Sequence, residues 1–424
     1  MMRHRRDAAV TLIAAALVVL TMTGCAGSAT EPGPGSGSGA GSGSDSTAAT
    51  AATAADDRFV AALADPIADW RTSYLSSSMT FAVPGTVLGA SVGDTPVSLV
   101  ASGDAELDIR PMETDDAFHI GSMTKLFTAA LIMQLDEEGV LSLDDTLDTW
   151  FPEAPNASEI TVRMLLQHES GLYELDFSLV GVVSNQQLID NVFAQKPIAA
   201  PGTSYQYLNA GYIILGRVAE EASGRRYQDL VESRLIEPQG LTDTYLDGYG
   251  TGPVAVDGYD LDCADGASGS DCLGEPSTPE PTSPIPSPQW TGAWSAGGMV
   301  STAHDQAVWI RALVSGDVVD EEHRALMAEL TPLSAAYYGD AYAAAGIPAV
   351  QLGEGTGLTS WAVPGVGTCL GHAGSIPGAN GVAAYCPDAQ LSIVILNDID
   401  PAGTAPGYPG LLELAPAALD ALRD

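Results

Sequence analysis

The sequence predicts an α+β domain, in which an antiparallel sheet is flanked by helices and interrupted by a mostly helical region. Alternating apolar and small residues toward both ends of the chain are typical of strands, whereas the patterns of about 131–250 are mostly helical. Strands at both ends with helices between them imply a sheet whose halves meet around the inserted region. A cleft between the two parts is the expected place for a site.

The composition describes an acidic chain with enough apolar residues for a large core. Asp and Glu number 54 against 16 Lys and Arg, which gives a formal net charge of -38, and 46% of the residues are hydrophobic. Because no strongly basic face is available, we expect no nucleic-acid partner and no binding to anionic lipid headgroups.

Residues 1–24 have the pattern of an export signal. Three arginines precede an apolar run over 8–22 that is too short to span a bilayer. The run ends in "MTGC", which resembles a bacterial lipobox, although Met22 lies where leucine is commoner. We therefore expect Cys25 to carry a lipid; the alternative is an ordinary cleaved signal with an incidental cysteine.

Residues 25–56 are rich in Gly, Ser and Ala and lack the apolar content that would compensate for ordering. We expect them to form a flexible tether for a domain over 57–424. A lipid anchor and a tether together predict a domain held at the outer face of a bacterial cytoplasmic membrane.

The first strands are predicted by "VPGTVLGASVGD" and "PVSLVASGDAEL", which read as a β-hairpin around Gly-Asp. The next segment, "KLFTAALIMQL", is apolar on nearly every face and predicts a central, buried helix that opens at Ser122 and closes at Gly139.

Residues 260–288 lack periodicity and hold six prolines, so they predict a long surface loop. An exported protein with an even number of remaining cysteines is expected to pair them, and proximity favours Cys263 with Cys272 across this loop. These spacings do not resemble a zinc site and no histidine is near, so we expect no metal.

Three segments near the C-terminus, "GTCLGHAGS", "GVAAYC" and "LSIVILND", predict consecutive strands, with a closing helix after them. A hairpin that turns on Pro377-Gly378 places Cys369 directly opposite Cys386, within disulfide reach. This crosslink would pin the strand that carries His372 and contribute about 3 kcal/mol by loop-closure entropy.

Ser122 and Lys125 lie three residues apart, so their side chains share one face of a helix. A serine at a helix N-terminus lies beside free N–H groups that favour an oxyanion. Burial would lower the pKa of Lys125 far enough for it to act as a base. The alternative is an ordinary surface lysine, because Ser-x-x-Lys alone is a weak motif.

Two further stretches help to interpret the pair of Ser122 and Lys125. They are Tyr207-Leu208-Asn209 in "SYQYLNAGYIILG" and His372-Ala373-Gly374 in "LGHAGSIPG". With Ser122-Met123-Thr124-Lys125 in this chain order, they resemble the three motifs of the serine β-lactamase and penicillin-binding-protein superfamily. The resemblance is to the Tyr-x-Asn branch, which includes class C β-lactamases, certain D-alanyl-D-alanine carboxypeptidases and a group of esterases. It covers about residues 80–400 and implies a β-lactamase/transpeptidase-like fold. Four further segments are similar to family segments in the expected order: "ITVRMLLQHESGL", "LIEPQGLTDT", "SAGGMVSTAHD" and "LSIVILND".

The resemblance implies roles for the residues of the first two motifs. Ser122 would be the acylated nucleophile. Lys125 and Tyr207 would share proton transfer, and Asn209 would hold Lys125 and a substrate carbonyl. The family needs no cofactor for this chemistry, so none is expected.

The third motif would contribute His372, Gly374 and Ser375 to substrate binding, with the backbone N–H groups of Ser122 and Ser375 as the oxyanion hole. His372 stands where many relatives carry lysine. Three other aromatic residues are instead assigned to structure. His168 is expected to cap helix carbonyls, and Tyr205 and Tyr212 are expected in the core.

The sequence departs from the family pattern where a substrate carboxylate would bind. Ala373 lacks the hydroxyl that relatives often place there, and no Lys or Arg occurs over 327–422. Only His372 remains as a potential cation of this strand. If it is charged it replaces the missing partner; if it is neutral, esters and amides without a carboxylate are favoured.

These observations predict an exported serine hydrolase with D-alanyl-D-alanine carboxypeptidase-type activity, working through an acyl-enzyme. The expected substrates are small peptides, esters or lactams, with peptidoglycan stem peptides among them. The alternatives are a carboxylesterase, a class C-like β-lactamase and a non-catalytic module that binds cell-wall fragments.

Overall fold

The computed structural model describes residues 48–73, 83–181, 183–263, 277–281, 291–316, 318–345, 349–400 and 407–423. Cys25, Cys272 and residues 1–47 lie outside these ranges, so the predicted export signal, the lipidated cysteine and the Cys263–Cys272 bridge are not described. Within the described ranges, no helix combines the length and the apolar character needed to cross a membrane.

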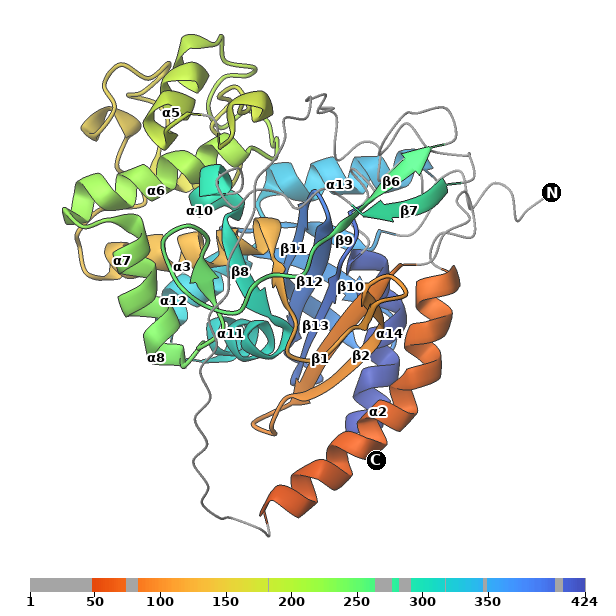
Figure 1. The fold of residues 1–424 in the computed structure, drawn as a ribbon. Coiled ribbons are helices and arrows are strands. Elements are labelled where there is room, and N and C mark those ends of the chain that lie inside the picture. Colours follow the sequence, from red (N-terminus) through yellow and green to blue (C-terminus); the bar gives the residue numbers. More distant parts are fainter. Residues whose placement is uncertain are drawn as a thin grey trace.

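The centre of the fold is an eight-stranded antiparallel sheet in the order β3-β2-β1-β13-β12-β11-β10-β9 (Figure 1). Strand β1 pairs with β13, with Thr86 opposite Asn397. The predicted α+β class is therefore confirmed, because the first and last parts of the domain meet in the middle of one sheet. The strands are β1 (Gly85–Val92), β2 (Ser98–Glu106), β3 (Arg110–Pro111), β9 (Gln351–Glu354), β10 (Thr359–Val363), β11 (Gly367–Ile376), β12 (Ala379–Cys386) and β13 (Leu391–Asn397).

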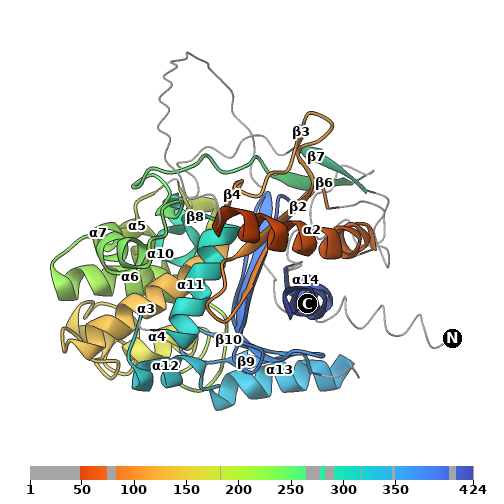
Figure 2. The same ribbon diagram turned by 90° about the horizontal axis from the view of Figure 1, so that it is seen from below.

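Helices cover both faces of this sheet. In Figure 2, α2 (Ala48–Ser73) and α14 (Gly407–Arg423) lie on one face and α11 (Ala303–Ser315) on the other. Strand β13 has apolar side chains on both faces, and each face needs a covering layer. Ile393 and Ile395 belong to the core beneath α2 and α14, whereas Val394 and Leu396 belong to the core on the opposite face. A strand buried on both faces reads as an unbroken apolar run because alternate side chains enter different cores.

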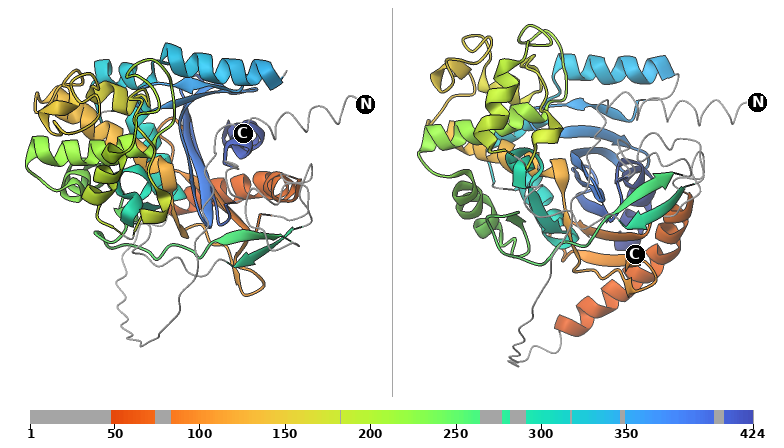
Figure 3. Two further views of the ribbon diagram at one scale, coloured as in Figure 1. Left: turned by 90° about the horizontal axis from the view of Figure 1, so that it is seen from above. Right: turned by 45° about the horizontal axis from the view of Figure 1, so that its top comes forward.

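The inserted helical region packs around α3 (Thr124–Glu137), which is buried along most of its length, as predicted. A second sheet, in the order β4-β8-β5, connects this region to the main sheet. Helix α13 (Pro332–Ala345) lies along the β9 edge of the main sheet, which Figure 3 shows from above. The remaining elements are α4 (Val162–Leu166), α5 (Asn185–Ala194), α6 (Asn209–Ser223), α7 (Tyr227–Val231), a π-helical turn (Glu232–Ile236), α8 (Glu237–Gln239), α10 (Trp294–Gly297), α12 (Glu321–Ala328), α13 (Pro332–Ala345), β4 (Ala117–His119), β5 (Tyr245–Leu246) and β8 (Met299–Thr302).

Two boundaries differ from the sequence-based expectation. Helix α2 begins at Ala48, so residues 48–56 of the expected tether are helical; this stretch is rich in alanine, the strongest helix former. Part of the expected loop over 260–288 is also regular, because β6 (Tyr259–Cys263) pairs with β7 (Ser277–Pro281). The prolines led to the prediction of a loop. A strand at the edge of a sheet can nevertheless contain proline, because its outward N–H groups need no partner.

The predicted C-terminal hairpin and its disulfide are confirmed. Strands β11 and β12 turn at Pro377-Gly378, where Gly378 has a φ of 84°, a value that favours glycine. Cys369 is bonded to Cys386 directly across the hairpin. The crosslink therefore ties the strand that carries His372 to its neighbour.

Candidate active site

The nucleophile and its neighbouring lysine come from one turn of the chain. Ser122 lies in a 3-10 turn, Gly121–Met123, and α3 starts after it at Thr124, two residues later than predicted. Lys125 is in the first turn of α3, and its Nζ is 2.9 Å from Ser122 Oγ. Ser122 is half-buried and Lys125 is fully buried.

Three acceptors surround the amine of Lys125. Its Nζ donates to Ser122 Oγ, to Asn209 Oδ1 at 2.7 Å and to the Ala296 carbonyl at 2.7 Å. It also lies 5.0 Å from the ring centroid of Tyr207. Burial lowers the pKa of Lys125 to about 7, although two buried carboxylates, described below, oppose the shift. A lysine with this pKa is partly neutral at pH 7 and can accept a proton.

Tyr207 completes this arrangement from the segment before α6. Its hydroxyl forms a hydrogen bond with Ser122. Burial raises the pKa of Tyr207 well above its ordinary value, and the hydrogen bond with Ser122 only partly opposes that rise. Tyr207 is therefore a neutral phenol at pH 7, which can pass a proton on, while Lys125 is the group with an available lone pair.

Asn209 is oriented by a carboxylate that the sequence did not predict. Glu174 Oε2 accepts from the Asn209 backbone at 2.9 Å and from its side-chain amide at 3.2 Å, and Glu174 Oε1 accepts from Ala210 N at 3.0 Å. Leu208, at the N-cap of α6, offers no capping side chain. Glu174 therefore satisfies the first N–H groups of α6 and turns the Asn209 oxygen toward Lys125.

The third motif, on β11, lies against the nucleophile turn, which is the 3-10 turn Gly121–Met123 that carries Ser122. A Cβ added to Gly374 would be 2.0 Å from the Ile120 carbonyl oxygen, and one added to Gly121 would be 2.8 Å from Ser375 N. The backbones of β11 and of the Ser122 turn are therefore in direct contact. This contact places Ser375 beside Ser122, as the resemblance implied.

His372 lies beside Tyr207, with their ring centroids 6.1 Å apart. Burial, and then the charge of Lys125, lower the pKa of His372 to about 3. Its Nδ1 donates to the Ala373 carbonyl at 2.5 Å. His372 is therefore neutral at pH 7, which answers the question that the sequence left open, and β11 offers no cation to a carboxylate.

The backbone N–H of His168 donates to the Leu165 carbonyl at the end of α4 at 3.4 Å, but its side chain caps no helix carbonyl. Its Nδ1 instead accepts the Leu208 N–H at 3.0 Å, and its ring stacks on Tyr207. Burial and the nearby Lys125 keep its pKa well below the ordinary value, so the ring is neutral. Tyr205 and Tyr212 are buried, as predicted.

Sequence reasoning missed a second acidic residue as well as Glu174. Glu354, on β9, is buried and accepts from Tyr205 Oη at 2.8 Å and from Thr359 Oγ1 at 3.3 Å. Burial raises its pKa, and its charge acts on Lys125 and Tyr207. No sequence motif predicts that either glutamate belongs to the site, because both lie far from Ser122 in the chain and outside the three motifs. An uncapped start of α6 is the one sign that a distant acid was needed.

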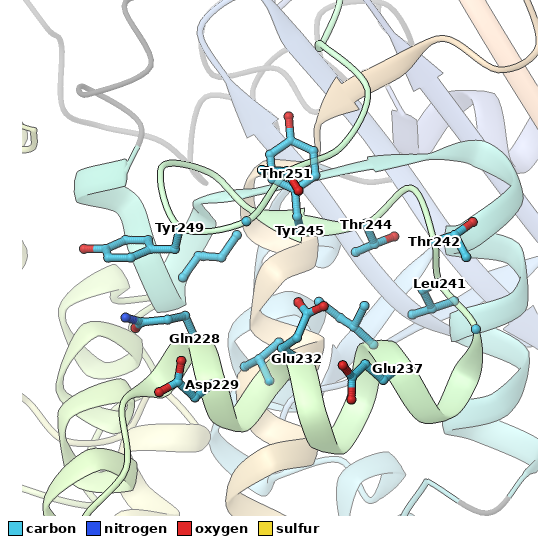
Figure 4. Close-up of a pocket in the computed structure, with 15 residues that line it drawn as sticks. Gln228, Asp229, Glu232, Glu237, Leu241, Thr242, Thr244, Tyr245, Tyr249 and Thr251 are labelled. Atoms are coloured by element: carbon cyan, nitrogen blue, oxygen red, sulfur yellow. The ribbon is translucent and has the colours of Figure 1, made fainter. Parts of the chain in front are cut away.

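Other features of the structure lie away from this chemistry. A cavity of about 520 Å³ lies between the helical run over 227–239 and the segment over 240–251 that contains β5, and none of the motif residues lines it (Figure 4). Within the described part of the chain, Glu137, Asp320 and His323 have metal-like spacing at the opposite end of α3. Both His323 nitrogens already bond to carboxylates, at 2.8 and 2.9 Å. Burial opposes the shift, but the hydrogen bonds with Asp136 and Asp320 raise the pKa of His323 above its ordinary value.

Known proteins share this family and this fold. A family model described as Beta-lactamase matches residues 57–406. The chain is 32% identical over 184 residues to "Penicillin-binding protein 4*" of Bacillus subtilis (strain 168), covering 41% of this chain and 40% of that protein. The chain thus spans well under two thirds of that relative. It is 27% identical over 352 residues to Penicillin-binding protein 4 of Amycolatopsis lactamdurans, covering 78% of this chain and 88% of that protein.

A solved structure supports the fold alone. D-amino acid amidase from Ochrobactrum anthropi SV3, complexed with L-phenylalanine amide, has a TM-score of 0.67 and 24% identity, covering 87% of this chain and 99% of that chain.

Proposed function

The chain belongs to the beta-lactamase family and has the β-lactamase/transpeptidase-like fold, and from this premise we propose that it is an exported serine hydrolase that works through an acyl-enzyme on Ser122. One observation carries the proposal. A buried lysine whose pKa is about 7 holds its Nζ 2.9 Å from a serine hydroxyl that also bonds to a neutral tyrosine. This is the arrangement of a nucleophile with a base and an acid.

Acylation uses all three side chains. Ser122 Oγ bonds to the carbonyl carbon of the substrate as its proton passes to neutral Lys125. Tyr207 gives its proton to the leaving nitrogen or oxygen, and Lys125 replaces that proton, so the leaving group departs neutral. The backbone N–H groups of Ser122 and Ser375 would bind the oxyanion, with each donor worth about 3 kcal/mol.

Deacylation runs through the same groups in reverse. Water attacks the ester carbonyl while Tyr207 and Lys125 take up its proton, and Ser122 Oγ leaves and recovers a proton. The acid leaves, and the three side chains return to their starting state.

The substrate that the site supports best is an ester or amide without a free carboxylate beside the scissile bond. Neutral His372 and the methyl group of Ala373 offer no charge and no hydroxyl where such a carboxylate would lie. A carboxylate buried there without a partner is costly. We therefore place neutral esters and amides first among the activities of this site.

D-alanyl-D-alanine carboxypeptidase activity is the second candidate. The penicillin-binding names of two relatives and the export-like pattern of residues 1–24 favour it. A lipid on Cys25 would place the domain at the outer face of the membrane, beside peptidoglycan. Palmitate labelling that is lost in Cys25→Ser tests the anchor; equal labelling of both proteins, or labelling of neither, would refute it.

A panel of three substrates tests the activity: p-nitrophenyl acetate, a D-alanyl-D-alanine peptide and nitrocefin. We expect the ester to be turned over fastest, and all turnover to disappear in Ser122→Ala but not in Ser178→Ala, which changes an exposed serine. Fluorescent penicillin should label Ser122 only. Turnover that persists in Ser122→Ala, or no adduct with any ester or lactam, would reject the proposal and favour a binding module.

His372→Lys tests the choice of substrate. A lysine would restore the cation that many relatives carry, so the peptide rate should rise relative to the ester rate by about tenfold, as expected when one charge-assisted contact of about 1.4 kcal/mol is gained. His372→Gln, which is neutral, serves as the matched control. An unchanged ratio in His372→Lys would show that this strand position does not decide the substrate.

A further inference from the structure

Tyr207 is held by neither a helix nor a strand. Residues 204–208 have no regular secondary structure, and α6 begins only at Asn209. The acid that donates to the leaving group must nevertheless keep its hydroxyl at Ser122, because a small displacement of a catalytic group costs a large part of its effect. Some other contact must therefore fix the phenol ring.

Besides an edge contact with the Tyr205 ring, His168 makes three contacts with this segment that enclose Tyr207. Its carbonyl oxygen accepts the Gln206 N–H at 2.9 Å, and its Nδ1 accepts the Leu208 N–H at 3.0 Å. Its ring stacks on the Tyr207 ring with centroids 4.4 Å apart and planes 27° apart. The backbone is thus held on both sides of Tyr207, and the side chain is held on one face.

We propose that His168 is the positioning residue for Tyr207, and that Glu354 fixes the imidazole from behind. The proposal rests on the proposed function, because positioning matters only if Tyr207 transfers protons. His168 itself touches no reacting atom; it acts through Tyr207.

The tautomer of His168 follows from its contacts. Because Nδ1 accepts a hydrogen bond and the ring is neutral, the proton is on Nε2. That nitrogen lies 3.8 Å from Glu354 Oε2, the oxygen that Tyr205 also contacts. A negative or hydrogen-bonding oxygen on this side favours the Nε2–H tautomer, and so leaves Nδ1 free to accept from Leu208.

The backbone of His168 supports a role beyond core filling. Its φ is 58°, a left-handed value that is uncommon for residues other than glycine, although histidine adopts it more often than most. The imidazole at this position is enclosed, with its side chain only 2% exposed. Strain of this kind is kept where the surroundings use the resulting geometry.

Two substitutions of His168 distinguish its hydrogen bond to Leu208 from its stacking on the Tyr207 ring. His168→Asn tolerates the left-handed backbone and keeps an acceptor near Nδ1, but it loses the ring. His168→Phe keeps a ring and loses the acceptor. We expect each to lower kcat for p-nitrophenyl acetate by about 10- to 100-fold with little change in KM, because only proton transfer is affected. Tyr227→Phe, which alters a buried tyrosine bonded to Thr128, is the control and should keep the wild-type kcat.

A double-mutant comparison distinguishes positioning from general damage. If His168 acts through Tyr207, His168→Asn should cost nothing further in a Tyr207→Phe background. A loss that multiplies with that of Tyr207→Phe, or a wild-type kcat in both His168 variants, would overturn the proposal. Glu354→Gln, which keeps the shape of the side chain, should give a smaller loss of about threefold to tenfold in the same direction.

A spectroscopic measurement keeps the proposal testable if the wild type has no Ser122-dependent turnover. In the full-length protein with ring-labelled tyrosine, the NMR signal lost in Tyr207→Phe identifies Tyr207. Removing the stacked ring in His168→Asn should shift and broaden this signal, whereas Tyr227→Phe should not. An unmoved Tyr207 signal in His168→Asn contradicts the proposal independently of any activity.

Discussion

The carboxylate of Glu174 accepts from both the backbone and the side-chain amide of Asn209, which lies 35 residues further along the chain. One side chain thus caps α6 and aims the amide oxygen that receives Lys125. The proposed function therefore makes stability and catalysis depend on the same two oxygens.

Glu174→Ala should therefore reduce both properties. Loss of a helix cap costs about 1 kcal/mol, and a freely rotating Asn209 no longer holds Lys125, so we expect kcat/KM to fall by about tenfold or more. Urea unfolding and ester kinetics measure the two effects. Exposed Glu153→Ala is the control. A variant with full activity and full stability would show that Glu174 has neither role.

The pH dependence of the rate should report Lys125. Its ammonium is charged below a pKa of about 7 and neutral above it, so kcat/KM should rise with pH through an acidic limb near pH 7. Glu354→Gln removes a charge that stabilises the ammonium, so the limb should move to lower pH. A limb that stays in place, or that moves to higher pH, contradicts the assignment of Lys125 as base.

The same shift links stability to pH. The pKa of Lys125 is about 7 in the folded chain and about 10.5 when unfolded, so between these values the unfolded chain binds more protons and stability rises with pH. Relative to Lys125→Met, the wild type should gain about 2 kcal/mol of unfolding free energy between pH 7 and pH 9. Urea unfolding of both proteins at the two pH values gives the difference. Parallel changes in the two proteins would mean that the pKa of Lys125 is not lowered.

Close packing of β11 on the nucleophile turn predicts that Gly374→Ala inactivates the site. Its Cβ would be 2.0 Å from the Ile120 carbonyl, so the strand must move away from Ser122. We expect a loss of at least about tenfold in kcat/KM, since a displaced oxyanion donor costs several kcal/mol. Gly339→Ala, where nothing lies within 4 Å, is the matched control. Equal kinetics for the two variants would show that the contact is easily relieved.

Part of the site could be predicted from local spacing or a simple register, and the roles of Tyr207, Asn209 and His372 were predicted from the family resemblance. Ser122 and Lys125 share one turn, and the disulfide of Cys369 and Cys386 follows from the midpoint of a two-residue turn. The glutamates could not be predicted. Glu354 meets Tyr205 across 149 residues of chain, and no local pattern encodes such a contact. The alanine-rich start of α2 was missed because composition alone does not separate a linker from a helix.

The pairing of β1 with β13 limits when the main sheet can form during synthesis of the chain. The hydroxyl of Thr86 donates to the amide oxygen of Asn397 at 2.8 Å, across 311 residues of chain. The middle of the sheet therefore cannot close while a ribosome is still making the last strands. Such long-range closure is slow, and it leaves the earlier strands without their neighbour until synthesis is nearly complete. The centre of the sheet is therefore completed only after β13 has been synthesised, whereas the contacts within the inserted helical region do not depend on that strand.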